Sequence, residues 1–417
     1  MEYFAVQGGV PLEGCAAVHG AKNSALPILA ATLLAPGEHI IHNCPDLSDT
    51  AAALAILSSL GCRVRREGDT VLVNSTLCQS CGVPDTLMGT MRASVLFLGA
   101  LLARNGRACA CWPGGCALGE RPIDLHLRAF QCLGARVQER EGRLCCQGPR
   151  LRGCCIQLPF PSVGATENAI LAACAAQGYT EILNPARELE IVDLQGFLRS
   201  CGAQIWGAGT GRIVVQGGVP LHPGEYSVMP DRIVCATYLC ALAAAGGEGE
   251  IYAAQAAAVA PVLEALSAAG CQIWETPRGL ALRRRGSLWG IGPITTAPYP
   301  GFPTDAQPLL AAVLAVGRGE SSIRETIFEN RFRYACQLRR LGARVRLEGD
   351  SAYITGTPLH GALVEAEDLR GGAALTIAAL AAQGESRICG LGHIDRGYDR
   401  LERALACLGG RIWREED

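Results

Sequence analysis

The chain has 417 residues, a formal net charge of −2, and 49% hydrophobic residues with only 5% aromatics. This length suits two domains better than one, and the hydrophobic fraction is sufficient to fill large cores. The near-neutral charge excludes nucleic-acid binding through bulk electrostatics, so any anion site must be built locally. No stretch reaches the roughly 18 consecutive apolar residues of a membrane span, which excludes membrane insertion.

The opening Met1-Glu-Tyr-Phe4 lacks the basic segment and apolar core of a secretory signal. The 21 cysteines are also too sparse for a disulfide scaffold, so we expect reduced thiols and a cytoplasmic location. Cys78-Gln-Ser-Cys81 has a zinc-like spacing, but no second such pair follows, and we expect no metal there. Adjacent cysteines such as Cys145-Cys146 and Cys154-Cys155 fall in strand-like segments and are expected mostly to fill the core.

A short signature, an apolar residue and glycine followed by a strand, recurs six times along the chain. Successive copies of its glycine are 73, 68, 68, 72 and 67 residues apart, at Gly61, Gly134, Gly202, Gly270, Gly342 and Gly409. A second signature, an alanine-rich run that ends near a glycine, occurs once in each copy, at Gly37, Gly106, Gly178, Gly247, Gly319 and Gly384. The chain is therefore interpreted as six copies of one α/β unit, three per domain.

Each copy is predicted to run strand, helix, strand, helix and strand pair, with glycine ending both helices. In the first copy the elements are expected at Phe4–Gln7, about Asn23–Leu34, His39–His42, about Asp49–Leu60, Arg63–Arg66 and Thr70–Val73. A domain boundary is plausible at 217–223, where Gly, Pro and His interrupt the pattern. The glycine-rich run 207–211 joins two strands, so a hairpin turn is favoured over a phosphate loop.

Polar residues stand just before the first helix of every copy. Some are residue types that cap helices, at Asn23, Ser94, Ser162, Thr304 and Asp368. Capping does not call for Lys22, Arg92 or Arg370, because cations are disfavoured at the positive end of a helix. Loops before the second helices add Arg121, Arg331 and Arg396, and if two domains faced each other through these ends, the cations would surround a strongly anionic ligand.

The loop from Trp112 to His126 places Cys116 between glycines, with Arg121 five residues on. Glycines let a backbone approach a ligand closely, and a nearby guanidinium favours the thiolate. The alternative is a turn that merely carries a small apolar cysteine. Asp305 follows three prolines at the start of a predicted helix, where it is either an acid favoured by the helix dipole or a general base within the cationic site.

These motifs together closely resemble the UDP-N-acetylglucosamine 1-carboxyvinyltransferase family of enolpyruvyl transferases. The resemblance covers the chain from residue 20 to residue 398 and lies in Gly20-Ala-Lys22-Asn23, Met91-Arg92-Ala-Ser94, Pro113 to His126, Ser162 to Asn168, Pro230-Asp231-Arg232, Pro300 to Asp305, Phe328-Glu-Asn-Arg331, Asp368-Leu-Arg370 and Asp395-Arg396-Gly397-Tyr398. It implies a two-domain inverted α/β barrel of six βαβαββ repeats. The domains would comprise residues 22–229 and residues 1–21 plus 230–417, with the active site between them and the Cys116 loop as a lid.

The implied reaction transfers the enolpyruvyl group of phosphoenolpyruvate to the 3-hydroxyl of UDP-N-acetylglucosamine, with release of phosphate and without metal or organic cofactor. Asp305 would take the hydroxyl proton, and Cys116 would act as acid or transient nucleophile, with Lys22 and Arg396 also catalytic. Phosphoenolpyruvate would be held by Lys22, Asn23, Arg92, Arg121, Arg331, Arg370 and Arg396. The nucleotide sugar would be held by Asn23, Arg92, Arg121, Pro122, Ile123, Asp124, Leu125, Ser162, Val163, Gly164, Asp305 and Ile327. Fosfomycin, an epoxide analogue of phosphoenolpyruvate, should alkylate Cys116.

The sequence departs from the family pattern at two places. Val234 and Ala236 replace the usual acid and glycine near the expected hinge, and Leu189 replaces a proline between two glutamates. These changes put domain closure in question, while the principal catalytic positions are intact. The rival functions are a 5-enolpyruvylshikimate-3-phosphate synthase-like enzyme and a non-catalytic regulatory paralogue that binds UDP-sugar; a purely structural repeat protein leaves the matched cations unexplained.

Overall fold

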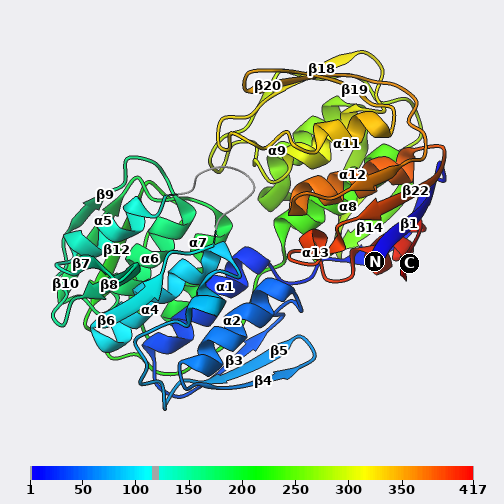
Figure 1. The fold of residues 1–417 in the computed structure, drawn as a ribbon. Helices are drawn as coiled ribbons and strands as arrows, with labels where there is room; N and C mark the ends of the chain where they lie inside the picture. The colour runs from blue at the N-terminus through cyan, green and yellow to red at the C-terminus, as the bar shows by residue number, and fades with distance from the viewer. Residues whose placement is uncertain (1, 115–121, 417) are drawn as a thin grey trace. The chain divides into compact units, whose positions relative to one another are not determined.

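The computed structural model describes residues 2–114 and 122–416. The described chain forms two compact units: a first unit of residues 20–114 and 122–229, and a second unit of residues 2–19 and 230–416. The chain leaves the second unit after β2 (Leu12–Ala17), forms the first unit, and returns at Pro230. Each unit has its own sheets (Figure 1). Each also has its own cluster of buried hydrophobic side chains.

The first unit contains three sheets. Their strand orders are β13 (Glu225–Ser227), β3 (Glu38–His42), β5 (Thr70–Asn74) and β4 (Arg63–Glu67); β6 (Arg107–Cys111), β8 (Arg143–Gln147) and β7 (Arg136–Arg140); and β11 (Gln204–Trp206), β12 (Arg212–Gly217), β10 (Gly178–Leu183) and β9 (Cys155–Gln157). In the sheet of β6, a parallel bridge from Gly82 to Cys109 takes the place of the first strand.

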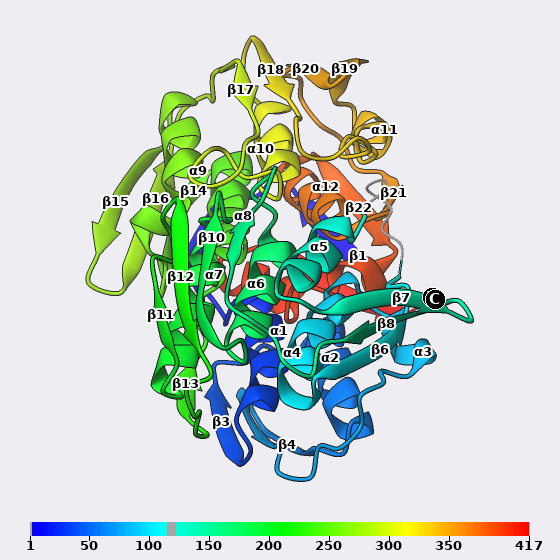
Figure 2. The same cartoon turned by 90° about the vertical axis from the view of Figure 1, so that its left-hand side faces the viewer.

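The second unit also contains three sheets, and Figure 2 shows β15, β16 and β14 side by side in one of them. Their orders are β15 (Gln272–Thr276), β16 (Gly279–Arg284), β14 (Gly247–Tyr252) and β2 (Leu12–Ala17); β17 (Ile294–Thr295), β18 (Glu320–Arg324), β20 (Ser351–Thr355) and β19 (Arg344–Glu348); and β21 (Leu363–Glu365), β22 (Gly384–Cys389), β1 (Glu2–Gly8) and β23 (Arg411–Glu416). The repeated order confirms the six-copy interpretation: the first strand is parallel to the second, and the last two are antiparallel to their neighbours.

The placement of the N-terminal strand corrects one prediction. Phe4–Gln7 does not open the first repeat; β1 lies between β22 and β23, with Phe4 opposite Ile388 and Arg414. β1 is therefore the last strand of the sixth repeat, and β13 supplies the first strand of the first repeat. Phe4 and Val6 are fully buried in the core of the second unit, and this burial favours the long-range pairing.

Apolar helices fill the middle of each unit. In the second unit α8 (Arg232–Ala245), α10 (Gln307–Leu314) and α12 (Leu369–Ala381) pack against one another and are buried on nearly all sides. Gly372 of α12 permits close packing against Ile394 and Ala366, because a Cβ there would lie 2.6 Å from Ile394 Cγ1 and 2.8 Å from Ala366 Cβ. The remaining helices of this unit are α9 (Ala256–Ala268), α11 (Ala335–Arg340), α13 (Leu391–Ile394) and α14 (Leu401–Cys407).

The first unit is built in the same way. Its central helices are α1 (Lys22–Ala31), α4 (Leu96–Asn105) and α6 (Val163–Ala173), with short 3-10 turns at η1 (Thr32–Leu34) and η2 (Arg92–Val95). Its other helices are α2 (Ser48–Ser59), α3 (Asp85–Met88), α5 (Asp124–Cys132) and α7 (Leu189–Ser200). The predicted elements of the first repeat after Phe4–Gln7 are confirmed to within one or two residues, apart from the 3-10 end of the first helix.

The repeated glycines meet a backbone requirement. Gly61, Gly134, Gly202, Gly270, Gly342 and Gly409 directly follow second helices and have φ between 88° and 106°, which confirms the predicted left-handed ends. The glycines after first helices behave differently. Gly106 ends α4 with φ 65°, whereas Gly178, Gly247 and Gly384 are the first residues of the next strands.

Two loop predictions have different outcomes. The run 207–211 joins the antiparallel strands β11 and β12, so the predicted hairpin turn is confirmed. The interruption at 217–223 does not end the first unit, because β13 follows it and pairs with β3. Within the described ranges no helix has the length and apolar character needed to cross a membrane.

Candidate functional site

A carboxylate held by two buried arginines is the main polar feature inside the second unit. Asp305 Oδ1 accepts a hydrogen bond from Arg331 Nη2 at 2.6 Å, and Asp305 Oδ2 accepts one from Arg370 Nη2 at 3.3 Å. The side chains of Arg331 and Arg370 are 1% and 3% exposed, whereas that of Asp305 is 29% exposed. The two arginine side chains are therefore buried, whereas the Asp305 carboxylate remains accessible to solvent.

The local chain explains why Arg331 is rigid. Its Nε donates to the Thr304 carbonyl at 3.0 Å, and its Nη1 lies 3.8 Å from Asp368 Oδ1. Asp368 is at the same time the N-cap of α12, where it accepts from the backbone N–H groups of Arg370 and Gly371. One carboxylate thus fixes both the start of α12 and the arginine beside Asp305.

Arg370 retains unused hydrogen-bonding capacity. Its Nε and Nη1 are buried without a hydrogen-bond acceptor among the described residues. Burial lowers the pKa of Arg370, but its acidic neighbours, among them Asp305 and Asp231, raise it by more, so the guanidinium stays charged. Leaving buried guanidinium N–H groups without a hydrogen-bond acceptor costs free energy, so Arg370 is suited to bind an anionic oxygen.

Tyr398 lies against Arg370 on the side of α8. Arg370 Cζ is 5.3 Å from the Tyr398 ring centroid, and the Tyr398 hydroxyl hydrogen-bonds with Thr237 Oγ1 at 2.8 Å. Burial raises the pKa of Tyr398, which keeps the phenol neutral. Arg396, two residues before Tyr398, is half-buried. The predicted Asp395–Tyr398 segment therefore contributes to the surroundings of Arg370.

The turn that carries Ile327 is held by a buried acid. Glu325 Oε1 accepts from the backbone N–H groups of Ile327 at 2.8 Å and Phe328 at 3.2 Å. Glu325 also accepts from the hydroxyls of Thr296 and Thr304, both at 3.0 Å. The same carboxylate therefore ties the Ile327 turn to the loop before Asp305.

In the first unit, Lys22 and Asp49 form a buried ion pair. Lys22 Nζ lies 3.1 Å from Asp49 Oδ2, and the two side chains are 11% and 8% exposed. Lys22 is the first residue of α1, and Asn23 beside it is half-buried. Asp49 balances the cation that would otherwise oppose the positive end of the helix.

Asp193 anchors the start of α1 from the neighbouring helix α7. It accepts hydrogen bonds from the hydroxyls of Ser24 and Tyr226 and, at 3.1 Å, from the backbone N–H of Met229. Burial raises the pKa of Asp193, while these hydrogen bonds oppose that effect. The carboxylate thus links the helix that begins with Lys22 to the last residue of the first unit.

A buried histidine lies beside Arg92 and the start of α6. His126 Nδ1 is 2.7 Å from Asn168 Nδ2 and accepts its hydrogen bond. Burial and the charge of Arg92 lower the pKa of His126 to about 3, so the ring is neutral. A Cβ on Gly164 would lie 3.0 Å from His126 Cε1, which makes glycine the fitting residue there. Ser162, Val163 and Gly164 are half-buried at this helix start.

Acidic residues also gather near α7. Glu167 and Glu190 are buried, and burial, followed by the charges of Glu190 and Glu188, raises the pKa of Glu167 well above its usual range. The raised pKa favours the protonated, neutral form of Glu167, which reduces the repulsion within this group.

The capping predictions are only partly confirmed. Ser162 and Asp368 do cap α6 and α12. Ser94 instead donates to the carbonyls of Met88 and Met91, and Thr304 donates to Glu325. α1 begins after Ala21, without a side-chain cap from Asn23. The predictions for Ser94 and Thr304 were wrong because other acceptors take the hydroxyls: nearby carbonyls for Ser94 and the Glu325 carboxylate for Thr304.

Cys116 and Arg121 lie outside the described residues. Of the turn that follows, Pro122 and Asp124 are exposed, Ile123 is buried and Leu125 is half-buried, with Asp124 as the first residue of α5. In the described parts of the chain, no group of three or more His, Cys, Asp or Glu side chains is arranged to hold a metal ion.

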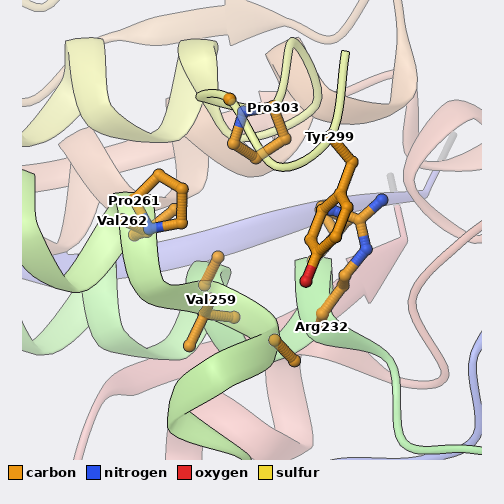
Figure 3. A pocket seen from close by; sticks show the side chains of 10 residues that line it. Arg232, Val259, Pro261, Val262, Tyr299 and Pro303 are labelled. Carbon is orange, nitrogen blue, oxygen red and sulfur yellow. The ribbon is translucent and has the colours of Figure 1, made fainter. Parts of the chain in front are cut away.

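A small, mainly apolar hollow lies in the second unit between the starts of α8 and α9 (Figure 3). Arg232 lies along the ring of Tyr299 at its rim, 5.8 Å from Cζ to the ring centroid. Val259, Pro261 and Pro303 form much of the rest. None of the predicted site residues lines this hollow, although Pro303 on its wall lies two residues before Asp305.

Comparison with known proteins decides the family. Residues 6–405 match the family described as EPSP synthase (3-phosphoshikimate 1-carboxyvinyltransferase). The chain is also 47% identical to UDP-N-acetylglucosamine 1-carboxyvinyltransferase 2 of Caldanaerobacter subterraneus subsp. tengcongensis, over 99% of this chain and 100% of that one. The chain belongs to the enolpyruvyl transferase family. A further relative, the UDP-N-acetylglucosamine 1-carboxyvinyltransferase of Dinoroseobacter shibae, is 44% identical over the whole of both chains.

Solved structures agree with this membership. The enolpyruvyl transferase NikO from Streptomyces tendae superposes with a TM-score of 0.88 at 28% identity, covering 99% of this chain and 98% of that chain. EPSP synthase from Acinetobacter baumannii has a TM-score of 0.79 at 19% identity, with full coverage of both, and supports the fold alone. The predicted mixed α/β fold of the enolpyruvyl transferases is confirmed, with six separate sheets in the described residues rather than one closed barrel.

Within this enolpyruvyl transferase, the structure brings some predicted residues together and adds others. It joins Asp305, Arg331 and Arg370 directly. The supporting residues Tyr226, Thr237 and Glu325 were not predicted. Tyr226 and Thr237 carry no motif, and their partners lie 33 and 161 residues away. Glu325 is a single acid that accepts from the turn just after it and from Thr304, 21 residues before it.

Proposed function

We propose that this enolpyruvyl transferase transfers the enolpyruvyl group of phosphoenolpyruvate to the 3-hydroxyl of UDP-N-acetylglucosamine and releases phosphate. This would be the first committed step of peptidoglycan precursor synthesis, in the cytoplasm. The choice of acceptor is supported by the relatives, which are named for UDP-N-acetylglucosamine at 44–47% identity over nearly whole chains.

The observation that carries the proposal is the Asp305 carboxylate held by Arg331 and Arg370. A carboxylate fixed in position and still 29% exposed is suited to take a proton from a hydroxyl. Arg370 offers two buried donors beside it, which suits a phosphate or carboxylate oxygen. A base and an anion receptor in contact are what the addition of a hydroxyl to an anionic enol ester requires.

In the proposed reaction, the sugar 3-oxygen bonds to C2 of phosphoenolpyruvate as Asp305 accepts its proton, and C3 gains a proton. The tetrahedral adduct then loses phosphate from C2 and a proton from C3, which restores the double bond. Donors placed before the reaction neutralise the anion with little reorganisation. We assign this task to Lys22, Asn23, Arg92, Arg121, Arg331, Arg370 and Arg396.

The remaining predicted residues are proposed to bind the nucleotide sugar. They include the turn Pro122 to Leu125, the helix start Ser162 to Gly164, and Ile327. Cys116 is proposed as acid or transient nucleophile, and alkylation of Cys116 by fosfomycin, located by peptide mass spectrometry, would support that assignment. An adduct found only on other cysteines would contradict it.

The function is tested by phosphate release from purified protein given phosphoenolpyruvate and either UDP-N-acetylglucosamine or shikimate-3-phosphate. Release that depends on the nucleotide sugar and is lost in Asp305→Ala supports the proposal. Asp350→Ala is the matched control, because Asp350 is an acid on the surface of the same unit, paired with Arg324 at 2.7 Å. Binding of UDP-N-acetylglucosamine without phosphate release would favour a regulatory paralogue instead.

A further inference from the structure

The sheet of β6, β8 and β7 carries two cysteines in contact. Cys109 of β6 and Cys145 of β8 are register partners, and their Sγ atoms are 2.8 Å apart. Both residues are half-buried, whereas their neighbours Ala108 and Cys146 are 2% and 0% exposed. Because side chains alternate along a strand, Cys109 and Cys145 lie on the face opposite the core. We refer to Cys109 and Cys145 as the dithiol pair.

The backbone shows that the pair has the geometry for a covalent link. The N–H of Cys109 donates to the Cys81 carbonyl at 2.7 Å, and the Cys109 carbonyl accepts from the N–H of Val83 at 3.0 Å. Both backbone groups of Cys109 thus point away from β8, so Cys109 and Cys145 are a non-hydrogen-bonded pair. The Cα atoms of such pairs are about 4.5 Å apart, within the roughly 4.4–6.8 Å that disulfides span.

We propose that the dithiol pair is an oxidation site, which hydrogen peroxide converts to a disulfide between β6 and β8. This site is independent of the proposed transferase function. A thiolate attacks one peroxide oxygen, the O–O bond breaks, and the sulfur becomes a sulfenic acid as hydroxide leaves and is protonated to water. The second sulfur then attacks the sulfenic sulfur and loses its proton, and a second water leaves. Two thiols and one peroxide give one disulfide and two waters.

The two sulfurs take different roles in this oxidation. Burial, followed by the hydrogen bond to Cys145, raises the pKa of Cys109 to about 11. Cys109 is therefore almost entirely a thiol at pH 7. In the proposed order Cys145 attacks the peroxide and Cys109 attacks the sulfenic sulfur, and the variants below test this order. Contact between the two sulfurs makes the resolving step intramolecular and fast, so the sulfenic acid should not accumulate.

The test uses the full chain. Protein treated with graded hydrogen peroxide is blocked with one thiol reagent, reduced, labelled with a second, and mapped by mass spectrometry. The proposal predicts that the second label appears on Cys109 and Cys145 together at the lowest peroxide levels, and that dithiothreitol reverses the linkage. A disulfide between other cysteines, such as Cys81 with Cys109, or oxidation of isolated thiols before this pair would overturn it.

Variants separate the two roles and guard against general cysteine oxidation. In Cys109→Ser, Cys145 should accumulate a sulfenic acid that dimedone traps, whereas the parent should show little. Cys336→Ser is the matched control, since Cys336 is an exposed thiol of the other unit, and it should leave formation of the Cys109–Cys145 disulfide unchanged. Dimedone labelling of Cys145 at equal levels in the parent and in Cys109→Ser would contradict the resolving role of Cys109.

Discussion

Asp305→Asn separates the proposed chemistry at Asp305 from the support that this residue gives to its neighbours. Asparagine keeps the volume of the side chain and one acceptor oxygen, but it cannot take a proton from the acceptor hydroxyl. A positioned general base contributes roughly 10²–10⁴-fold. We therefore expect kcat to fall by about that factor, which corresponds to ~3–5 kcal/mol of activation free energy.

The same substitution also has a stability cost. It leaves Arg331 and Arg370, which are 1% and 3% exposed, without their shared carboxylate. Removing one partner of a buried ion pair costs ~3–5 kcal/mol. Asp305 is 29% exposed, and Asp368 remains 3.8 Å from Arg331, so we expect about 2 kcal/mol instead. For a unit of roughly 200 residues this lowers the unfolding temperature by about 4–8 °C.

Steady-state phosphate release and calorimetry measure the two effects separately. The KM for phosphoenolpyruvate should stay within a few-fold of the parent value, because both arginines remain. Asp350→Asn, which breaks an exposed ion pair, should change neither the rate nor the unfolding temperature appreciably. A folded Asp305→Asn protein with kcat within tenfold of the parent would refute the general-base assignment.

Three further predictions concern stability. The folded state lowers the pKa of His126 to about 3, below the unfolded value near 6.5. The contribution of His126 to the free energy of unfolding should therefore be fully present above about pH 6.5 and fall by up to ~4 kcal/mol towards pH 3. His126→Gln should reduce this dependence of stability on pH, measured by urea titrations. Gly372→Ala places a Cβ 2.6 Å from Ile394 Cγ1 and should cost ~1–3 kcal/mol by calorimetry. Asp193→Ala removes three hydrogen bonds, from Ser24, Tyr226 and the Met229 backbone, and should cost ~2–4 kcal/mol by urea unfolding.

Each of these predictions has its own control. Gly392→Ala meets no atom within 4 Å and should be nearly neutral beside Gly372→Ala. His360→Gln is the control for His126→Gln. Because His360 is exposed, this substitution should leave the dependence of stability on pH unchanged. Asp193→Asn should be milder than Asp193→Ala, since its amide oxygen still accepts; equal losses would mean that the hydrogen bonds of Asp193 are not the cause.

The regular parts of the fold could be predicted because they depend on local requirements. The glycine after each second helix needs a positive φ, so six copies of one signature located six helix ends. The N-terminal strand could not be placed in this way. Nothing in Phe4–Gln7 identifies β22 and β23 as its partners, since that choice depends on burial in a core formed by residues almost 400 positions away.

The candidate site likewise contains residues that could be predicted from the sequence and residues that could not. Arg370 was singled out because a cation at the positive end of a helix contradicts ordinary capping. Arg331 stood at a matched loop position before a second helix, and the role of Asp305 came from the family resemblance. The hydroxyls of Ser94 and Thr304 were misassigned, because a capping residue type does not reveal whether the hydroxyl will donate to a nearby carbonyl, as in Ser94, or to a distant carboxylate, as in Thr304. Thr237 was not predicted, since its partner Tyr398 is 161 residues away and its own surroundings are apolar.

The most direct test of the central claim is the identity of the product. Purified protein is incubated with phosphoenolpyruvate, UDP-N-acetylglucosamine and shikimate-3-phosphate together, and the products are resolved by mass spectrometry and NMR. The account predicts that the nucleotide sugar alone gains an enolpyruvyl ether, at the 3-oxygen, in step with phosphate release. Transfer to shikimate-3-phosphate, or recovery of both acceptors unchanged from folded protein, would contradict it.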